Sequence, residues 1–275
     1  MAERPLVFLI TGCSSGIGHA IAAAAVRRGH RVFATARHPE SIADLGSTVD
    51  TLSLDVTDSA SIHAAAAEAV ARAGRIDVLV NNAGYGQMGT VEDISMAQWR
   101  AEYDVNVFGL IETTKAVLPV LRRQQSGYIV NIGSIAGRIA YPFGGAYCSS
   151  KFAIEAITDA LRLEVEPFGI RVVLIEPGAI RTRFNDRVKS EVDPLVHSPA
   201  SPYHARYESA FERFRRESSM GALPAEAVAR VVLKAVSMRK PRARYLVTAP
   251  AKIAAFAKRF IPDSLMDAVM RSKFR

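Results

Sequence analysis

Seven short apolar runs divide the chain, and between most of them apolar residues recur every three or four positions. Uninterrupted apolar runs of this length are typical of parallel strands that are covered on both faces. Their alternation with helical segments indicates an α/β fold. The runs predict strands at Leu6 to Thr11, Arg31 to Ala36, Leu52 to Leu54, Ile76 to Val80, Gly127 to Ile132, Arg171 to Ile175 and Tyr245 to Thr248.

Helical spacing of apolar residues predicts helices in the intervening segments. We expect helices from the glycine motif at Gly12 to about Arg28, from about Asp58 to Ala73, from Met96 through Asn106 to Leu121, after Tyr147, and from Pro224 to about Met238. The segment from Met96 to Leu121 is long enough for one long helix or a broken pair.

The hydrophobic pattern weakens from Arg181 to about Gly221. This segment contains Pro194, Pro199 and Pro202 and a scatter of aromatic residues, namely Phe184, Tyr203, Tyr207, Phe211 and Phe214. A long, poorly regular segment with aromatic residues predicts a lid with an apolar inner surface. The alternative is a surface loop with one packing helix.

The segment from residue 250 to 275 mixes apolar residues with lysines and arginines. Its apolar members are Ile253, Phe256, Phe260, Leu265, Met266 and Met270. This composition predicts basic amphipathic helices, which either pack on their own domain or make weak contact with a membrane surface or a partner.

Composition narrows the class of protein. The 275 residues are 49% hydrophobic and 23% charged, which is typical of one large soluble domain with a full core. Neither Cys13 nor Cys148 has a CxxC or metal-ligand spacing, so we expect a reduced, cytoplasmic protein without a metal site. No apolar stretch approaches the roughly 20 residues of a membrane span.

The net charge of +8 is compatible with nucleic acid, an acidic membrane surface or a phosphorylated ligand. The basic excess lies mainly between Arg181 and Arg275. Since no zinc-ligand spacing, RNA-binding signature or long basic run accompanies it, we do not expect nucleic-acid binding. Solubility and attraction for an anionic cofactor account for the charge.

A glycine-rich turn follows the first predicted strand and opens a helix, with the sequence Gly12-Cys13-Ser14-Ser15-Gly16-Ile17-Gly18. Glycine at these positions lets backbone N–H groups approach a pyrophosphate without a Cβ in the way. The motif therefore predicts a dinucleotide site, with an ordinary tight turn as the alternative.

The second predicted strand ends at Ala36-Arg37, where an NAD-preferring site usually has an acidic residue. Arg37 can pair with a 2′-phosphate, so NADP is favoured over NAD. The alternative is an exposed arginine that serves only solubility. Asp55, after the third strand, either reaches the adenine or caps its loop.

Polar residues also follow two later strands. Asn81-Asn82-Ala83-Gly84 ends the fourth strand, where these residues have no packing value, so we expect them to support the cofactor through the backbone. Gly133-Ser134 ends the fifth strand, and ligands of open α/β sheets bind beyond such carboxyl ends. Asn106 lies among apolar neighbours and needs partners, as a structural bond or as part of a proton path.

Tyr147 and Lys151 stand four residues apart in a predicted helix and should share one face. A cation about 4 Å from a phenol, at an effective dielectric constant of about 20, is worth at most roughly 4 kcal/mol, or about 3 pKa units. The pair therefore predicts an acid/base device, although an isolated pair of this kind is common.

Together these residues resemble the short-chain dehydrogenase/reductase family from about Leu6 to Thr248. The motifs are TGCSSGIG at Thr11 to Gly18, NNAG at Asn81 to Gly84, Asn106, Ser134, YCSSK at Tyr147 to Lys151, and PG at Pro177 and Gly178. The segment YPFGGAYCSSKFAIEAI, the aromatic lid and the basic tail are most similar to the 17β-hydroxysteroid dehydrogenase and retinol dehydrogenase branch.

The resemblance implies a single Rossmann-type, doubly wound domain with a mostly parallel sheet of about seven strands. Residues 1–249 would bind NADP and carry out catalysis, with the lid at about 181–221, and residues 250–275 would be a helical tail of the same domain. The implied cofactor-binding residues are Gly12, Ser14, Ser15, Gly16, Ile17, Gly18, Arg37, Asp55, Val56, Asn82, Ala83, Gly84, Asn106, Tyr147, Lys151, Pro177, Gly178, Ile180 and Thr182.

The resemblance also implies roles for individual side chains. Tyr147 would be the general acid/base, and Lys151 would lower the pKa of Tyr147 and bind the nicotinamide ribose. Ser134 would hold the substrate oxygen, and Asn106 would anchor a water that links Lys151 to solvent. In addition, Thr182 would bond the carboxamide, while Ile180 would help to hold the nicotinamide ring.

The function implied is an NADP-preferring oxidoreductase, with NAD also accepted, acting on a hydrophobic alcohol or ketone that is steroid-, retinoid- or lipid-like. Such proteins commonly form homodimers or homotetramers through their long helices. The alternative is a catalytically idle protein of the same fold that senses NADP or binds a partner.

Overall fold

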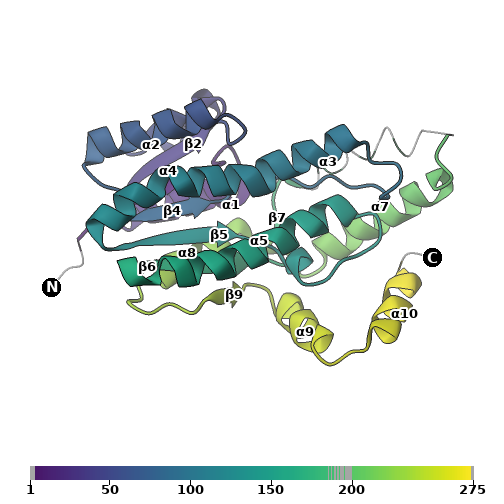
Figure 1. The fold of residues 1–275 in the computed structure, drawn as a ribbon. Coiled ribbons are helices and arrows are strands. Elements are labelled where there is room, and N and C mark those ends of the chain that lie inside the picture. Colours follow the sequence, from purple (N-terminus) through teal and green to yellow (C-terminus); the bar gives the residue numbers. More distant parts are fainter. Residues whose placement is uncertain are drawn as a thin grey trace.

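The computed structural model describes residues 4–184 and 200–273, together with residues 186, 188, 190, 192 and 195. Its centre is a sheet of seven strands in the order β3-β2-β1-β4-β5-β6-β9, and every neighbouring pair is parallel (Figure 1). The strands are β1 (Val7–Ile10), β2 (Arg31–Ala36), β3 (Asp50–Ser53), β4 (Val78–Asn81), β5 (Gly127–Ile132), β6 (Ile170–Glu176) and β9 (Arg244–Leu246). The expected Rossmann-type sheet is thus confirmed.

Helices cover both faces of this sheet (Figure 1). One face packs against α2 (Ser59–Ala73), α4 (Gly109–Gln124) and α5 (Gly145–Glu164), and the other against α1 (Gly16–Arg27) and α8 (Ala225–Val236). Short 3-10 helices occur at η1 (Pro39–Leu45), η3 (Ile135–Gly137) and η4 (Glu166–Phe168). The strand order reverses between β1 and β4, which opens a crevice at their carboxyl ends.

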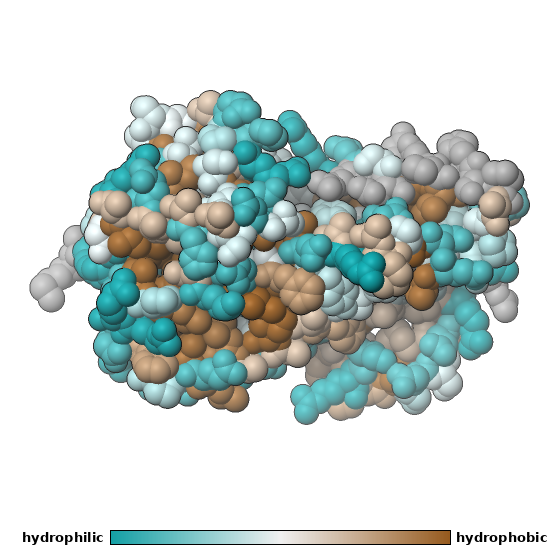
Figure 2. Space-filling model, turned by 45° about the horizontal axis from the view of Figure 1, so that its top comes forward, coloured by the Kyte–Doolittle hydropathy of each residue, from teal (hydrophilic) through white to brown (hydrophobic). Residues whose placement is uncertain are grey.

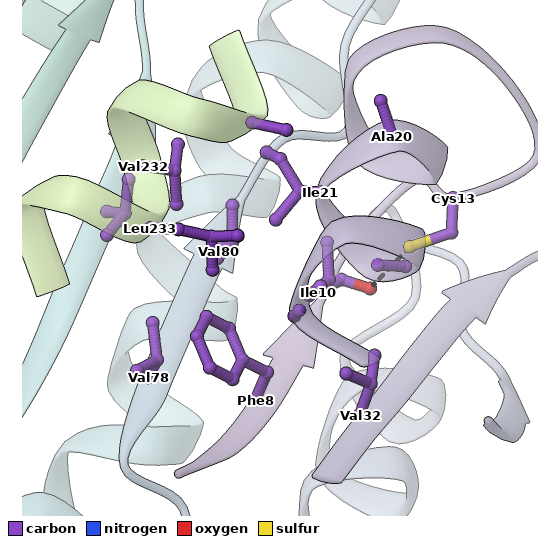
Figure 3. Close-up of a cluster of buried hydrophobic side chains, with 14 of the residues drawn as sticks. Phe8, Ile10, Cys13, Ala20, Ile21, Val32, Val78, Val80, Val232 and Leu233 are labelled. Carbon is purple, nitrogen blue, oxygen red and sulfur yellow. Dashed lines mark hydrogen bonds between the residues drawn. The ribbon is translucent and has the colours of Figure 1, made fainter. Parts of the chain in front are cut away.

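Alternate residues of each central strand enter two different cores, which is why the strands read as continuous apolar runs. Phe8 and Ile10 of β1 and Val80 of β4 face α1 and α8. They share one core with Ile21 of α1 and Val232 of α8 (Figure 3). The neighbouring positions Val7, Leu9 and Leu79 face the opposite core, against α2 and α4.

The predicted segment from Met96 to Leu121 is one continuous helical stretch that contains a π-helical turn (Figure 1). Helix α3 (Met96–Tyr103) begins with a capping box in which Ser95 and Gln98 bond each other's backbone N–H groups. A π-helical turn, η2 (Asp104–Phe108), then joins α3 to α4. Such turns are frequent at functional sites, and this one contains Asn106.

The region expected to be poorly regular contains ordered elements. Helix α7 (His204–Ser219) follows a short strand, β7 (Ile180–Arg181), which pairs with β8 (Leu223–Pro224). The helix forms because Tyr207, Ala210, Phe211 and Phe214 repeat at helical spacing and bury one face. The lid expectation for residues 185, 187, 189, 191, 193, 194 and 196–199 lies outside the described residues.

The tail forms two helices, α9 (Ala249–Lys258) and α10 (Asp263–Lys273). They lie apart from the sheet and its covering helices, at the end of the molecule where α7 projects (Figure 1). None of the described helices combines the length and apolar character needed to cross a membrane.

Candidate active site

The predicted site residues follow the carboxyl ends of neighbouring strands, as the parallel sheet requires. The glycine turn follows β1, Arg37 follows β2, and Asp55 follows β3 by two residues. On the other side of the crevice, Asn82 to Gly84 follow β4, Ser134 follows β5 by two residues, and Pro177 follows β6. The fold therefore collects them along one edge of the sheet.

The glycine turn after β1 is too tight for side chains. Gly12 and Gly16 have φ angles of 71° and 62°, a left-handed conformation that favours glycine. A Cβ at Gly12 would lie 2.8 Å from the Cα of Ala83, and one at Gly18 would lie 2.5 Å from the carbonyl oxygen of Gly12. The backbone of this turn is thus closely packed and unshielded by side chains.

Two polar side chains hold the turn against the end of β4. The side-chain amide of Asn82 donates to the carbonyl oxygens of Thr11 and Gly12, both at 2.9 Å. The Thr11 hydroxyl accepts from the backbone N–H groups of Asn82 and Ala83, both at 3.0 Å. Thr11 was not among the predicted site residues, although it opens the glycine motif.

The residues of the turn fit a dinucleotide pyrophosphate. Ser15 is the N-cap of α1, and its side chain makes no capping hydrogen bond, which leaves the N-terminal N–H groups of a 12-residue helix for an anion. The Thr182 side chain packs closely against Gly16: a Cβ at Gly16 would lie only 3.1 Å from it. Ser14 is exposed beside the turn, and Ile17 packs against the core below it.

Arg37 is exposed at the end of β2, where a 2′-phosphate would bring negative charge. Asp55 is close enough for the charge of Arg37 to act on it. Partial burial alone would raise the pKa of Asp55, but hydrogen bonds from the N–H and hydroxyl of Thr57, at 2.9 and 2.8 Å, and the charge of Arg37 lower it overall. Asp55 thus caps its own loop.

Val56 lies on the other side of the same loop, against the start of α4. A Cβ at Gly109 would come within 2.8 Å of both the Cβ and the carbonyl oxygen of Val56. This contact fixes the loop that carries Asp55 to the helix that follows Asn106.

Asn81, the first residue of the NNAG motif, corrects one expectation. We expected the motif to have no packing value, but Asn81 is buried and donates to Thr114 Oγ1 and Asn131 Oδ1, both at 2.9 Å. Asn131 in turn donates to Thr158 Oγ1 at 2.9 Å. This polar chain ties β4 and β5 to α4 and α5.

Tyr147 and Lys151 lie in the first two turns of α5, as predicted. The Lys151 Nζ atom is 5.8 Å from the centroid of the Tyr147 ring and donates to the carbonyl oxygen of Ile132 at 3.1 Å. The Ser134 side chain is close enough to the Tyr147 hydroxyl to lower its pKa by hydrogen bonding. The Ser134 hydroxyl also accepts from the N–H of Ala136 at 3.1 Å, which fixes the start of η3.

Burial dominates the acidity of this pair. It raises the pKa of Tyr147, the bond to Ser134 lowers it by less, and the charge of Glu102 raises it further. The direction is opposite to the one expected from Lys151 alone. Burial lowers the pKa of Lys151 to about 8, against the opposing charge of Glu102.

Glu102 is a site residue that the sequence reasoning missed. Its side chain is 0% exposed, and its Oε1 atom accepts from Asn106 Nδ2 at 2.6 Å and from the Ser150 hydroxyl at 3.1 Å. Its Oε2 atom accepts from the N–H of Gln87 at 2.9 Å. Glu102 thereby joins α3, α5 and the loop after β4 directly beneath the Tyr147 and Lys151 pair.

Asn106 belongs to the same hydrogen-bond network as Glu102. Its Oδ1 atom accepts from the N–H of Tyr85 at 3.0 Å, and its Nδ2 atom lies within bonding distance of the Tyr85 carbonyl oxygen, at 2.9 Å, and of Ser150 Oγ, at 3.1 Å. A Cβ at Gly84 would lie 2.9 Å from Asn106 Oδ1 and 3.8 Å from Lys151 Nζ. The Asn106 side chain is therefore engaged within the protein, and its predicted water remains a prediction.

The loop after β6 closes the other side of the crevice. The carbonyl oxygen of Pro177 accepts from the N–H of Ile135 at 2.9 Å, next to Ser134. Gly178 lies against the Thr248 hydroxyl, where a Cβ would clash. Ile180, in β7, pairs with Leu223 of β8.

Aromatic side chains cover the Tyr147 side of the crevice. The ring of Phe184 lies 5.3 Å from that of Tyr147. A small apolar pocket, partly open to solvent, lies in this cluster, lined by Met88, Gly89, Tyr141, Pro142, Phe143, Val192, Tyr207, Ala210, Phe211 and Phe214. Helix α7 forms one wall of it.

One polar cluster anchors α7 over the pocket. The Oδ2 atom of Asp93 accepts from the hydroxyls of Tyr207 and Ser201 at 2.7 Å and of Thr90 at 2.8 Å. The Tyr207 hydroxyl also accepts from the N–H of Thr90 at 2.9 Å. These hydrogen bonds lower the pKa of Asp93, although its partial burial opposes them.

Comparisons with known proteins agree with this geometry. A family model described as short chain dehydrogenase matches residues 6–193. The chain is 35% identical to a 3-ketodihydrosphingosine reductase of Bacteroides thetaiotaomicron, over 98% of this chain and 97% of that protein. It is 35% identical to an NADPH-dependent 3-dehydrocapnine reductase of Ornithobacterium rhinotracheale, over 95% and 94%, and 36% identical to 17-beta-hydroxysteroid dehydrogenase type 1 of Homo sapiens, over 88% and 77%.

Solved structures show the same fold. A short-chain dehydrogenase from Streptomyces avermitilis superposes with a TM-score of 0.81 at 34% identity, covering 98% of this chain and 96% of that one. A Burkholderia phymatum member in complex with NAD gives 0.80 at 27% identity, covering 97% and 96%. A Burkholderia cenocepacia member in complex with NADP gives 0.76 at 26% identity, covering 98% of both chains.

Proposed function

Because the chain belongs to the short chain dehydrogenase family, we propose that it is an NADP-preferring oxidoreductase that acts on a hydrophobic alcohol or ketone. The observation that carries the proposal is the Tyr147 side chain, whose pKa Ser134 lowers by hydrogen bonding and whose ring centroid lies 5.8 Å from Lys151 Nζ, next to an apolar pocket. A proton donor on α5 and a hydroxyl just after β5 suit the oxygen of a carbonyl or alcohol.

A nicotinamide cofactor bound over the glycine turn would supply or accept the hydride. The residues of this chain do the rest. In reduction Tyr147 donates its proton to the carbonyl oxygen, and in oxidation it accepts the hydroxyl proton, while Ser134 holds the same oxygen. Burial lowers the pKa of Lys151 to about 8, and the charged form of Lys151 beside the phenol would oppose the rise that burial causes in the pKa of Tyr147.

The preference for NADP rests on Arg37. It is an exposed cation at the end of β2, where the 2′-phosphate distinguishes NADP from NAD. The NADPH-dependent relative and the NADP-bound neighbour support this preference, whereas the NAD-bound neighbour shows that members of similar structure also bind NAD.

The substrate proposed is steroid-, retinoid- or lipid-like. The pocket beside Tyr147 is lined by apolar and aromatic side chains, with Phe143, Phe211 and Phe214 among them. The relatives named for 3-ketodihydrosphingosine, 3-dehydrocapnine and a hydroxysteroid also favour a hydrophobic substrate.

We also propose that the enzyme is a cytoplasmic homodimer or homotetramer whose tail makes weak contact with a membrane surface. Phe108, Phe152 and Leu163, on η2 and α5, are 56%, 44% and 61% exposed. Figure 2 shows hydrophobic side chains gathered over the middle of the face in view, where α4 and α5 lie in Figure 1. A second copy would cover this face, and sedimentation equilibrium tests it.

The test of the activity is a panel of hydrophobic ketones and alcohols, followed by the absorbance of NADPH and, in parallel, NADH. We expect turnover with NADPH, and a loss of at least about 100-fold in Tyr147→Phe with cofactor binding retained. Tyr128→Phe is the matched control, because its hydroxyl bonds the Met238 carbonyl oxygen outside the site. Full activity of Tyr147→Phe would refute the proposal, and cofactor-dependent partner binding without turnover would favour the idle alternative.

A further inference from the structure

The two tail helices expose their hydrophobic side chains instead of burying them. Ile253, Phe256 and Phe260 are 70%, 69% and 66% exposed, and Leu265 and Val269 are 53% and 38% exposed. Ile253 and Phe256 share one face of α9 because they are three residues apart, and Phe260, in the turn after α9, has its ring 5.0 Å from that of Phe256. We call these five side chains the tail face.

The tail is anchored so that this face stays outward. At its start, the Thr248 hydroxyl caps α9 by accepting from the N–H of Ala251 at 3.3 Å, and Ala251 is buried against the body. At its end, Arg213 of α7 donates to the carbonyl oxygen of Ser272 at 2.9 Å. Packing of the tail on its own domain therefore leaves the tail face uncovered among the described residues.

The tail also has an excess of cations. Residues 249–273 contain Lys252, Lys258, Arg259, Arg271 and Lys273, against Asp263 and Asp267. Lys252, Arg259 and Arg271 are exposed, whereas Lys258 pairs with Asp263 at 2.7 Å. In the space-filling view the tail lies along the lower right edge, with mainly hydrophilic side chains on the side in view (Figure 2).

Exposed hydrophobic side chains together with cations favour one kind of binding partner for the tail face. A second copy of the tail would bring like charges together, which opposes association. An anionic bilayer offers both headgroups for the cations and an apolar interior for the aromatic rings. We propose that the tail face docks on the surface of a membrane that contains anionic lipid, with Phe256 and Phe260 below the headgroups and Lys252 and Arg259 among them.

The position of the tail face next to the pocket would let a substrate enter the pocket from the membrane, and this step rests on the proposed function. The Arg213 contact joins α10 to α7, and α7 supplies Phe211 and Phe214 to the wall of the apolar pocket. Docking therefore places the pocket beside the bilayer, from which a lipid-like alcohol or ketone enters it.

The test is co-sedimentation of the full chain with phosphatidylcholine vesicles, with and without a fraction of phosphatidylglycerol, in the absence of substrate and cofactor. We expect binding to the anionic vesicles that weakens in high salt, and little binding to the neutral ones. Lys252→Gln with Arg259→Gln should weaken binding on the order of twenty-fold, since each cation near such a surface contributes about five-fold. Arg27→Gln with Arg28→Gln, which removes the same charge from the exposed end of α1, should weaken it far less.

The aromatic side chains have their own variant. Phe256→Ser with Phe260→Ser should reduce binding at least about tenfold, whereas Phe168→Ser, at a 36% exposed position in η4, should not. Wild-type sedimentation of the tail variant, or none by the wild type, would overturn the proposal. So would a change of oligomeric state in the tail variant without vesicle binding, because it would assign the face to a second copy. Since no turnover is measured, these outcomes are independent of the proposed activity.

Discussion

Replacing Glu102 by glutamine tests whether a buried acid supports the acid/base pair. The side chain is fully buried, and both of its oxygens accept hydrogen bonds from groups of the site. Glutamine keeps the size and one acceptor but replaces the other oxygen by an amide donor. The substitution therefore removes a charge and one acceptor without leaving a cavity.

The expected loss of stability follows from the donors that remain. If the amide oxygen stays beside Asn106 and Ser150, the new N–H group faces the N–H of Gln87, which lies 2.9 Å from Oε2 in the native protein. A buried donor left without its acceptor costs about 1–3 kcal/mol. For a domain of this size, that corresponds to a fall of roughly 3–10 °C in the melting temperature.

The expected change in pH dependence follows from the charge. The carboxylate of Glu102 raises the pKa of Lys151, while burial lowers it to about 8 overall. Without that charge the pKa of Lys151 falls further, so the lysine loses its proton at a lower pH than in the wild type. If the cation is needed beside Tyr147, the alkaline limb of the kcat/KM profile moves to lower pH.

Thermal unfolding near pH 7 and kcat/KM between about pH 6 and 10 measure the two effects separately. Glu112→Gln is the matched control, because it neutralises an acid on the neighbouring α4 whose side chain is 27% exposed and pairs with Lys115. A wild-type melting temperature and pH profile in Glu102→Gln would refute the reasoning. A lower melting temperature with an unchanged profile would limit Glu102 to a structural role.

Three further substitutions test other parts of the site. Arg37→Ala should raise the KM for NADPH about 10- to 100-fold and leave the KM for NADH unchanged, because the proposed charge-assisted bond to the 2′-phosphate would be lost. Steady-state kinetics with both cofactors decide this. Tyr207→Phe removes the hydroxyl that donates to Asp93 at 2.7 Å, so unfolding should cost about 1–3 kcal/mol less, and KM should rise more than kcat falls if α7 shapes the pocket. Burial and the neighbouring Glu176 raise the pKa of Glu155 from 4.5 to about 7. The protonated form of Glu155 therefore contributes up to about 3 kcal/mol to the stability of the fold, fully below pH ~4.5, and this contribution is lost as the pH rises through ~7. Glu155→Gln should flatten the dependence of melting temperature on pH between about 5 and 8. An unchanged slope would contradict this.

The sheet could be predicted from the sequence because its strands are buried on both faces and lie next to glycine or polar turns. The predicted strand from Arg31 to Ala36 coincides with β2, and that from Gly127 to Ile132 coincides with β5. The helix from about Asp58 to Ala73 is α2, for which Asp58 is the N-cap and accepts from the N–H of Ala60. In these cases local pattern and tertiary burial agree.

Two features could not be predicted in this way. Glu102 lies in α3, whose sequence MAQWRAEY has almost no amphipathic pattern, so a glutamate there suggests a solvent-facing position. Only the packing of α3 against α5 and the loop after β4 buries it. Helix α7 did have a signal, since Tyr207 and Phe214 begin and end a helical stripe, but the prolines before it favoured an irregular segment.

The two halves of the site are held by different forces, and this difference indicates where substrate choice resides. Beneath Tyr147, the side chains of Glu102, Asn106 and Ser150 bond one another and the backbone of α5 and of the loop after β4, so small shifts would leave buried donors unpaired. Above it, the pocket is shaped by ring contacts such as that between Phe143 and Tyr207, at 5.1 Å, and by hydrogen bonds to the carboxylate of Asp93. Apolar contacts tolerate repacking far better than a buried polar network does. Substitutions on the pocket face of α7 should therefore change which substrate is accepted while leaving the proposed proton transfer intact.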